Sequence, residues 1–204
     1  MQGIIGRKTS KTFNLPMKIY IVGISCVGKT TIGRILADYL NYPFYDLDEE
    51  VEKYYQKPIE KIQNEGYSIL DYRKKASVVL DNLLTTEKNM VIAGTISGLK
   101  DSYFKIYKKH KKSKDLISIN IIDDPENVLN RLTFYDADSK LLEKVLDDNM
   151  RKMYLKEIVA DWKYFQKSLS LADIQINIRN IPLTQIPGLI VQNLNETHPN
   201  WVSK

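Results

Sequence analysis

The stretch KIYIVGISCVGKTT, residues 18–31, joins a short apolar run to a loop that contains two glycines. The run KIYIVG is nearly all apolar and ends in glycine, which is typical of a parallel strand buried on both faces. Gly23, Gly28, Lys29 and Thr30 match the spacing G-x-x-x-x-G-K-[ST], in which backbone N–H groups surround a di- or triphosphate. The apolar run predicts a strand before this loop, and the apolar residues that recur at helical spacing after it predict a helix.

Each residue type in this loop has a physical reason to be there. Gly23 and Gly28 permit backbone angles and a close approach that a side chain would block. Lys29 can neutralise charge on the β and γ phosphates of a nucleotide, and Thr30 can offer its hydroxyl to Mg²⁺. The helix that begins here directs its N-terminal N–H groups at the anion. The loop therefore predicts a nucleotide site; the alternative is a glycine turn without a ligand.

Strand-like and helix-like segments alternate along the rest of the chain. This alternation is typical of βαβ units, and it predicts an α/β fold in three layers with a five-stranded parallel sheet. The pattern favours one domain at 17–195, with a disordered extension at 1–16 and a tail at 196–204. Strands are expected at 18–23, 43–48, 89–94, 115–122 and 173–178. Helices are expected at 29–40, from Glu126, and in a long segment that ends near Leu169. Residues 49 to 86 are expected to be helical in pieces, with breaks at Pro58 and near Gly66.

Composition excludes several classes of protein. The chain has 204 residues, of which 43% are hydrophobic and 27% charged, as in an ordinary globular protein. No apolar run approaches the roughly 18 residues that cross a bilayer, so no membrane association is expected. The single cysteine, Cys26, excludes an internal disulfide, and with two histidines it cannot form a structural zinc site. We therefore expect a cytoplasmic protein.

The net charge of +5 raises the question of a nucleic-acid partner. Much of it comes from the start of the chain and from the run KIYKKHKKSK at 105–114. A basic run can bind nucleic acid. This run lies between two strand-like segments, however, and no second patch with interleaved aromatic residues extends it. The sequence therefore favours a solvated helix end, and nucleic acid is not an expected partner.

Several polar residues follow the ends of the predicted strands. In an open parallel sheet, ligands bind beyond the carboxyl ends of the strands. That rule brings Gly23, Asp46, Asp48 and Gly94 to one rim of the sheet. A carboxylate near a nucleotide's triphosphate can orient an attacking hydroxyl or take its proton. The alternative is that DLDEE is an acidic helix N-terminus, which the helix dipole stabilises.

The stretch IYIVGISCVGKTTIGRILADYLNYPFYDLDEEVEK, residues 19–53, resembles the shikimate kinase family. The loop, the T-I-G-R-x-L-A helix and a second strand ending in D-x-D match in order and spacing, and the similarity continues collinearly to about residue 195. The resemblance implies a P-loop kinase with strand order 2-3-1-4-5. It also implies ATP and Mg²⁺ as cofactors, and transfer of the γ-phosphate of ATP to a hydroxyl of a small carboxylated ring. The expected assembly is a monomer or weak dimer.

The resemblance also implies roles for single residues. Asp48 would bind the accepting hydroxyl and take its proton, and Asp46 would be an outer magnesium ligand acting through water. Arg73 would grip the acceptor's carboxylate; the alternative is a solvated helix arginine. Arg131, at the start of a lid near 131–142, would stack on adenine, and the stretch at 177–182 would close over its other face. The candidate residues are Lys29, Asp48 and Arg73 for catalysis; Gly23, Ser25, Cys26, Val27, Gly28, Lys29, Thr30, Thr31 and Arg131 for the nucleotide; Asp48, Arg73, Gly94, Thr95 and Lys140 for the acceptor; and Thr30 and Asp46 for the metal.

The chain departs from the family pattern on the acceptor side. After the third strand the family has three glycines, whereas AGTISG has Thr95 and Ile96 at two of those positions. Lys140 is the nearest substitute for a lid arginine, and Ala160 or Asp161 stands where a late arginine is expected. Losing a charged hydrogen bond costs about 1.5 to 3 kcal/mol, so these changes leave open whether the acceptor is shikimate or another hydroxylated metabolite. The sequence also leaves open a nucleotide-binding regulator without kinase activity and a nucleoside- or RNA-directed kinase.

Overall fold

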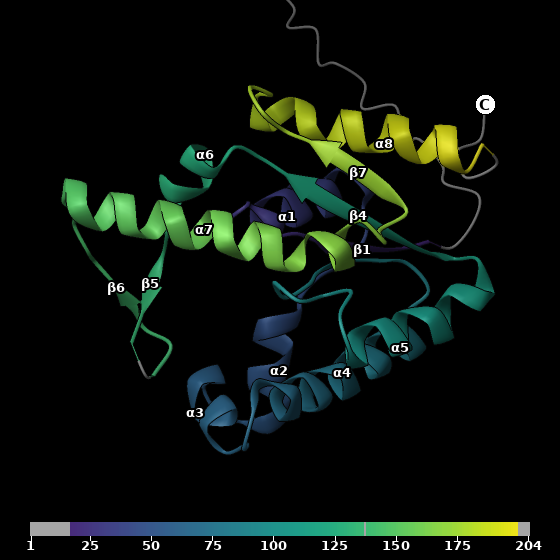
Figure 1. Ribbon diagram of the computed structural model, residues 1–204. Coiled ribbons are helices and arrows are strands. Elements are labelled where there is room, and N and C mark those ends of the chain that lie inside the picture. Colours follow the sequence, from purple (N-terminus) through teal and green to yellow (C-terminus); the bar gives the residue numbers. More distant parts are fainter. Residues whose placement is uncertain (1–16, 137, 200–204) are drawn as a thin grey trace, which may run out of the picture.

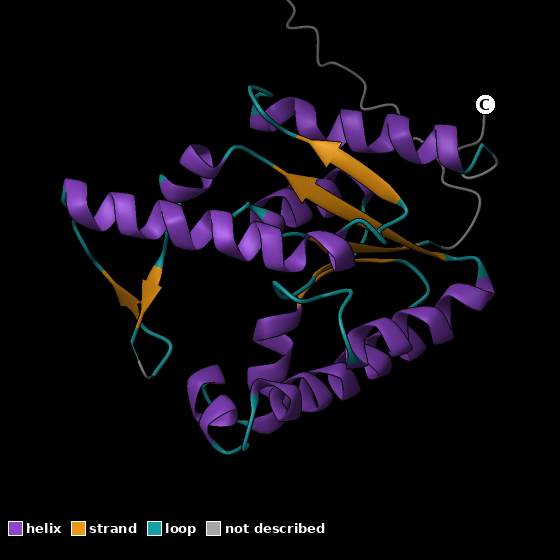
Figure 2. Ribbon diagram, viewed as in Figure 1, coloured by secondary structure: helices purple, strands orange, loops and turns teal. Residues whose placement is uncertain are grey.

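A parallel sheet of five strands forms the centre of the protein (Figures 1 and 2). The computed structural model describes residues 17–136 and 138–199, so the predicted extension at 1–16 lies outside the described residues. The strand order β2-β3-β1-β4-β7 confirms the predicted order 2-3-1-4-5, because β7 is the fifth strand of this sheet along the chain. All neighbouring strands are parallel, and their bounds are β1 Lys18–Val22, β2 Phe44–Asp46, β3 Met90–Ala93, β4 Leu116–Ile122 and β7 Ile174–Asn177.

Helices cover both faces of the sheet and complete the predicted three layers. Helices α1 and α8 pack against each other on one face, and α4 and α5 pack together on the other (Figure 1). Helix α7 packs against α6 and carries the chain back towards β7. The helical bounds are α1 Lys29–Leu40, α2 Leu47–Tyr55, α3 Ile59–Asn64, α4 Ile69–Thr86, α5 Ser102–His110, α6 Pro125–Leu129, α7 Asp148–Leu169 and α8 Ile186–Thr197, with short 3₁₀ helices at Lys111–Ser113 and Leu183–Gln185.

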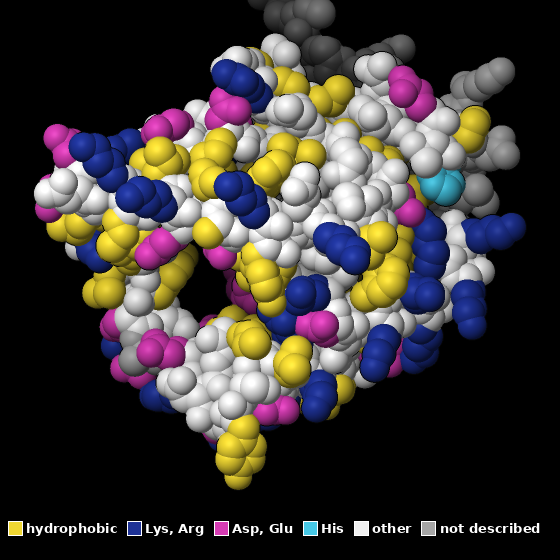
Figure 3. Space-filling model, viewed as in Figure 1, with side chains coloured by type: hydrophobic (Ala, Val, Ile, Leu, Met, Phe, Trp, Pro, Cys, Tyr) yellow, Lys and Arg dark blue, Asp and Glu magenta, His cyan; other side chains and the backbone are white. Residues whose placement is uncertain are grey.

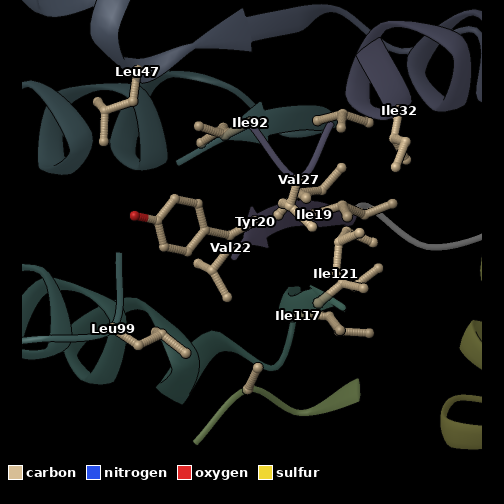
Figure 4. Packing of buried hydrophobic residues seen from close by; sticks show 14 of the residues in the cluster. Ile19, Tyr20, Val22, Val27, Ile32, Leu47, Ile92, Leu99, Ile117 and Ile121 are labelled. Carbon is tan, nitrogen blue, oxygen red and sulfur yellow. The ribbon is translucent and has the colours of Figure 1, made fainter. Parts of the chain in front are cut away.

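Burial along the strands explains why these segments form the sheet. Every residue of β1 and β3 is buried, as expected for central strands covered on both faces. In β7, at one edge of the sheet, buried and exposed residues alternate. The Tyr20 ring extends from β1 between Leu47 and Leu99, which belong to the α2 start and to the segment before α5 (Figure 4). The core therefore contains a large phenol close to the carboxyl ends of the strands.

The structure corrects the predicted end of the second strand. That strand was expected at 43–48, but β2 ends at Asp46 and α2 begins at Leu47. The reason is a helix cap: the Asp46 carboxylate Oδ1 accepts a hydrogen bond from the backbone N–H of Asp48 at 3.0 Å. Asp48 therefore lies in the first turn of a helix and not in the strand.

The segment between α6 and α7 contains a small hairpin that the sequence pattern does not reveal. Strands β5 (Phe134–Tyr135) and β6 (Leu141–Leu142) pair antiparallel and form a separate two-stranded sheet. Two residues per strand are too few for an alternating pattern, which explains why this stretch reads only as polar loop. Helix α8 also continues to Thr197, past the predicted domain end at 195.

The basic run at 105–114 forms the end of α5 and the short helix after it. Its cations are partly paired with acids: Lys109 bonds to Asp81 at 2.8 Å and Lys111 to Asp173 at 2.6 Å. Cations at a helix C-terminus also interact favourably with the helix dipole. This arrangement agrees with the predicted solvated helix end. Within 17–136 and 138–199, every helix is too short or too polar to traverse a bilayer.

Candidate active site

The loop from Gly23 to Gly28 connects β1 to α1 and has the backbone that its glycines require. Gly23 has φ 149° and Gly28 has φ 105°. A Cβ atom at Gly23 would lie 2.8 Å from the carbonyl oxygen of Ile121, so any side chain there would force the backbone to move. Cys26 also has a positive φ of 56°, although it is not a glycine. The loop is therefore tightly curved between the end of β1 and the N-terminus of α1.

The Lys29 side chain folds back across this loop. Its Nζ atom donates hydrogen bonds to the carbonyl oxygens of Gly23 at 3.1 Å and Ile24 at 2.9 Å. Burial lowers the pKa of the Lys29 ammonium, whereas the nearby Asp48 carboxylate raises it. Lys29 is partly buried, and a partly buried cation attracts an anion more strongly than a fully exposed one does. Lys29 is thus placed to bind the terminal phosphates of a nucleotide.

Thr30 and Asp46 lie together at the end of the loop. The Thr30 hydroxyl Oγ1 donates to the Asp46 carboxylate Oδ2 at 2.7 Å. Hydroxyl and carboxylate oxygens are the hard donors that Mg²⁺ prefers, and Mg²⁺ usually completes its shell with phosphate oxygens and water. The described residues contain no group of three or more His, Cys, Asp or Glu side chains that could hold a metal by themselves. The residues present therefore fit a magnesium ion that depends on a bound phosphate.

A cavity of about 440 Å³ opens beside the loop, a size suited to a nucleoside. Its walls come from four parts of the chain that are distant in sequence: the loop with α1, the end of β4, the segment after α6, and the turn before α8. Arg131 lines this cavity together with Ile178, Asn180 and Ile181, which belong to the stretch at 177–182 that the family resemblance implies for the adenine site. The lining residues are Val27, Gly28, Thr31, Ile32, Asp123, Asn127, Arg131, Ile178, Asn180, Ile181, Leu183 and Ile186.

Arg131 lines this cavity and also contacts the loop from Gly23 to Gly28. Its Nε atom donates to the Cys26 carbonyl at 3.2 Å, and its Nη2 atom bonds to the Asp123 carboxylate at 2.5 Å. Burial alone raises the pKa of Asp123, but hydrogen bonds from Asn127 and Arg131 lower it on balance. The Asp123 carboxylate, whose side chain is 2% exposed, is thereby kept ionised and holds the arginine against the loop.

Asp48 lies at the same rim, within electrostatic reach of the loop lysine. Burial and the neighbouring Asp46 raise the pKa of Asp48 to about 6, while Lys29 and a hydrogen bond from Tyr72 act in the opposite direction. The Tyr72 hydroxyl donates to Asp48 Oδ1 at 3.3 Å. Asp48 is therefore mostly ionised at neutral pH and can accept a hydrogen bond from a hydroxyl group.

Arg73 is buried and already paired, so it is not a solvated helix arginine. The residue is 5% exposed. Its Nη1 atom bonds to Asp101 Oδ2 at 2.6 Å, and its Nε atom donates to Ser97 Oγ at 3.2 Å. Tyr103 lies within electrostatic reach of both Arg73 and Asp48.

The segment from Gly94 to Asp101 is packed closely over the Tyr20 ring. A Cβ atom at Gly94 would lie 2.7 Å from that ring, and one at Gly98 would lie 2.9 Å from its hydroxyl. Thr95 is buried with 5% of its surface exposed. The two side chains that replace glycines after β3 thus belong to a compact turn, in which Gly98 N donates to Thr95 O at 3.1 Å.

Lys140 lies directly before β6, on the hairpin between α6 and α7. It is exposed, and its side chain is not among the contacts that surround Asp48 and Arg73 in the described part of the chain. The hairpin turn touches the other side of the site: Ser139 Oγ donates to Glu52 at 2.6 Å, and Lys61 bonds to Asp138 at 2.8 Å. Figure 3 shows a hollow between this hairpin and the helices opposite, with acidic side chains at its inner wall.

Sequence reasoning missed several residues that the structure brings into the site. Asp123 follows β4 at the carboxyl rim, so the rule on strand ends would have found it. Tyr72 directly precedes Arg73, and its contact with Asp48 was not predicted. Asp101 and Ser97 contact Arg73 from a different loop, and nothing in their local sequence indicates that pairing.

Comparisons with known proteins agree with this arrangement. A family model described as Shikimate kinase matches residues 25–167. The chain is 42% identical to a shikimate kinase from Aquifex aeolicus over 86 residues, covering 41% of this chain and 48% of that protein. It is 26% identical to one from Flavobacterium psychrophilum over 141 residues, covering 69% of this chain and 80% of that protein. The solved Aquifex aeolicus shikimate kinase superimposes with a TM-score of 0.67 at 27% identity, over 90% of this chain and 99% of that one.

Proposed function

The chain belongs to the shikimate kinase family, and on this premise we propose that it transfers the γ-phosphate of ATP to a hydroxyl group of shikimate. The alignment to the Aquifex relative spans less than half of that protein, so the acceptor is part of the proposal. One observation supports it above the others. The cation Lys29 and the partly buried carboxylate Asp48 interact across one rim of the sheet, which would bring a phosphate donor and a hydroxyl acceptor side by side.

The chemistry follows from these two groups. The Asp48 carboxylate accepts a hydrogen bond from the acceptor's hydroxyl and orients its oxygen towards the γ phosphorus. The new oxygen–phosphorus bond forms as the bond to the bridging oxygen breaks, ADP departs, and the proton passes to Asp48. Lys29 stabilises negative charge on the phosphates throughout. A magnesium ion held by Thr30 and Asp46 would neutralise further phosphate charge when bound.

Arg73 supports a carboxylated acceptor. A guanidinium binds a carboxylate in a planar, paired geometry, and Arg73 lies next in sequence to the tyrosine that contacts Asp48. Lys140 on the hairpin is a second cation that can approach from solvent. The hairpin contacts with Glu52 and Lys61 support the prediction that the segment near 131–142 is a lid. The predicted monomer or weak dimer and the cytoplasmic location remain predictions.

A coupled ADP-release assay tests this function. With ATP and Mg²⁺ present, we expect shikimate to stimulate ADP release above the rate without acceptor. Gluconate, simple polyols and nucleosides serve as the comparison panel. Release with one of those acceptors and not with shikimate would identify a different substrate. Tight ATP binding without phosphorylated product from any acceptor would instead favour a nucleotide-binding regulator.

Replacing Thr30 with valine is expected to raise the Mg²⁺ concentration that half-saturates ADP release by about 10- to 100-fold. Valine keeps the shape of the side chain but removes the hydroxyl that pairs with Asp46. Thr85→Val is the matched control, because the Thr85 hydroxyl bonds only to its own helix at Asp81 O among the described contacts. Equal Mg²⁺ dependence in T30V and the control would contradict the proposed metal ligand.

Replacing Arg131 with alanine is expected to raise the KM for ATP by about tenfold, since a charge-assisted contact at the nucleotide cavity is lost. The change also leaves the buried Asp123 carboxylate with fewer donors, so a modest loss of thermal stability is expected. Initial rates over a range of ATP concentrations provide the measurement. Arg34→Ala, which breaks an exposed ion pair to Glu49, is the control. An unchanged KM in R131A would remove this residue from the nucleotide site.

A further inference from the structure

We infer that Asp101 is a specificity-determining residue. Its carboxylate binds the Arg73 guanidinium in place of an acceptor's carboxylate, and this ion pair must break before a carboxylated acceptor binds. The inference rests on the proposed function, because it takes the region beside Asp48 as the acceptor site. It deepens that proposal by naming the internal group with which the substrate's carboxylate competes.

The contact geometry supports a direct competition. Asp101 Oδ2 lies 2.6 Å from Arg73 Nη1, and Ser97 Oγ lies 3.2 Å from its Nε atom. These two nitrogens are therefore engaged before any ligand binds. A second carboxylate placed on the same guanidinium would also lie close to the Asp101 carboxylate, and two like charges at such a distance repel each other.

The two partners differ in their freedom to move. The Arg73 side chain is 6% exposed, whereas the Asp101 side chain is 37% exposed. The arginine extends from the long helix α4 and is enclosed by its neighbours, but the aspartate stands at the boundary between a turn and α5. An incoming ligand can therefore displace the aspartate while the guanidinium stays in place.

The backbone at Asp101 favours its release. Asp101 has φ 54° and ψ −118°, a combination that an L-residue with a side chain rarely adopts. Asp101 also stands at the N-cap of α5, where aspartate normally accepts a hydrogen bond from the first helical turn, yet its side chain makes no such bond here. While it is paired with Arg73, the residue has a strained backbone and leaves α5 without a side-chain cap.

A second state is available to the same residue. Once an acceptor carboxylate takes the guanidinium, Asp101 can relax to extended backbone angles and accept from the free N–H groups of the first turn of α5. The capping bond and the relief of strain partly offset the lost ion pair. Asp101 therefore sets the affinity for the acceptor carboxylate without touching the phosphate chemistry.

The test measures binding rather than turnover. Calorimetry with ADP and Mg²⁺ present compares the wild type with Asp101→Asn, which keeps the shape but removes the competing charge, and with Asp101→Gly, which also removes the strain. The ligands are shikimate and its uncharged methyl ester. Asp81→Asn is the matched control, because Asp81 also links α4 to α5, through Lys109 and His110, away from the site.

We expect shikimate to bind D101N and D101G about tenfold more tightly than the wild type, with less than a twofold change for the ester. D81N should leave both dissociation constants unchanged. Weaker or unchanged shikimate binding in both Asp101 variants, or an equal shift for both ligands, would overturn the inference. Tighter shikimate binding by the Asp101 variants of a protein that releases no ADP would support the inference and reject the kinase function. Normal ADP release together with unchanged shikimate binding would support the kinase function and reject the inference.

Discussion

Replacing Lys29 with alanine is expected to lower kcat/KM for ATP by about 100- to 1,000-fold, the range found when one charge-stabilising donor is removed from an active site. Lys29 reaches across the loop to the carbonyl groups of Gly23 and Ile24 and is partly buried. Its charge would therefore act on the phosphates with less screening than that of an exposed lysine. Calorimetric titration with ATP should show a matching loss of nucleotide affinity.

Lys18→Ala is the control for this experiment. Lys18 begins β1, at the end of that strand away from the loop, and it pairs with Asp115 at 2.9 Å. Its loss tests whether removing a lysine side chain from the core of the domain is enough to disturb the fold. K18A should reduce thermal stability while keeping the KM for ATP, whereas K29A should keep thermal stability and lose binding. A K29A protein with normal ATP affinity would contradict the nucleotide site itself.

Replacing Asp48 with asparagine is expected to lower kcat by about 10²- to 10⁴-fold, with little change in the KM for ATP. Asparagine keeps the size of the side chain but cannot take the acceptor's proton. Single-turnover measurements with saturating ATP and shikimate separate this chemical step from product release. Because an ionised carboxylate near Asp46 is removed from a partly buried position, D48N should be at least as stable to heat as the wild type.

Glu49→Gln is the neighbouring control. Glu49 follows Asp48 in the same helical turn and forms an exposed ion pair with Arg34 at 2.7 Å. Exposed pairs contribute about 0 to 1 kcal/mol, so E49Q should behave like the wild type in both rate and stability. If D48N and E49Q retained equal, near-normal kcat values, Asp48 would not be the proton acceptor.

The loop that forms part of the proposed nucleotide site could be predicted from the sequence. The loop residues, Thr30 and Asp46 lie together in the structure, as the rule on strand ends predicts. The prediction works because the loop is local: its shape depends on two glycines and on the strand and helix that flank it. Arg131 was reached only through the family resemblance, and its partner Asp123 was not predicted.

The acceptor side could be predicted only in part. Asp48 and Arg73 were predicted as candidate residues, but their contacts were not. The Tyr72 hydroxyl contacts Asp48. Asp101 and Ser97 contact Arg73. The end of β2 was also placed too late, because a side-chain cap at Asp46 began the helix early. Such contacts depend on how turns and helices meet, which local patterns do not record.

The sequence by itself predicted the alternation of the sheet's strands with helices along the chain and the glycine loop before α1, since both follow from apolar spacing and glycine positions within about thirty neighbouring residues. The order of the strands within the sheet was predicted from the family resemblance. Only the tertiary structure decided the state of Arg73. Its carboxylate partner, Asp101, lies 28 positions away along the chain, and the two meet because α4 packs against the start of α5. The sequence shows that Arg73 can bind a carboxylate, whereas the packing of the helices decides that this carboxylate is that of Asp101.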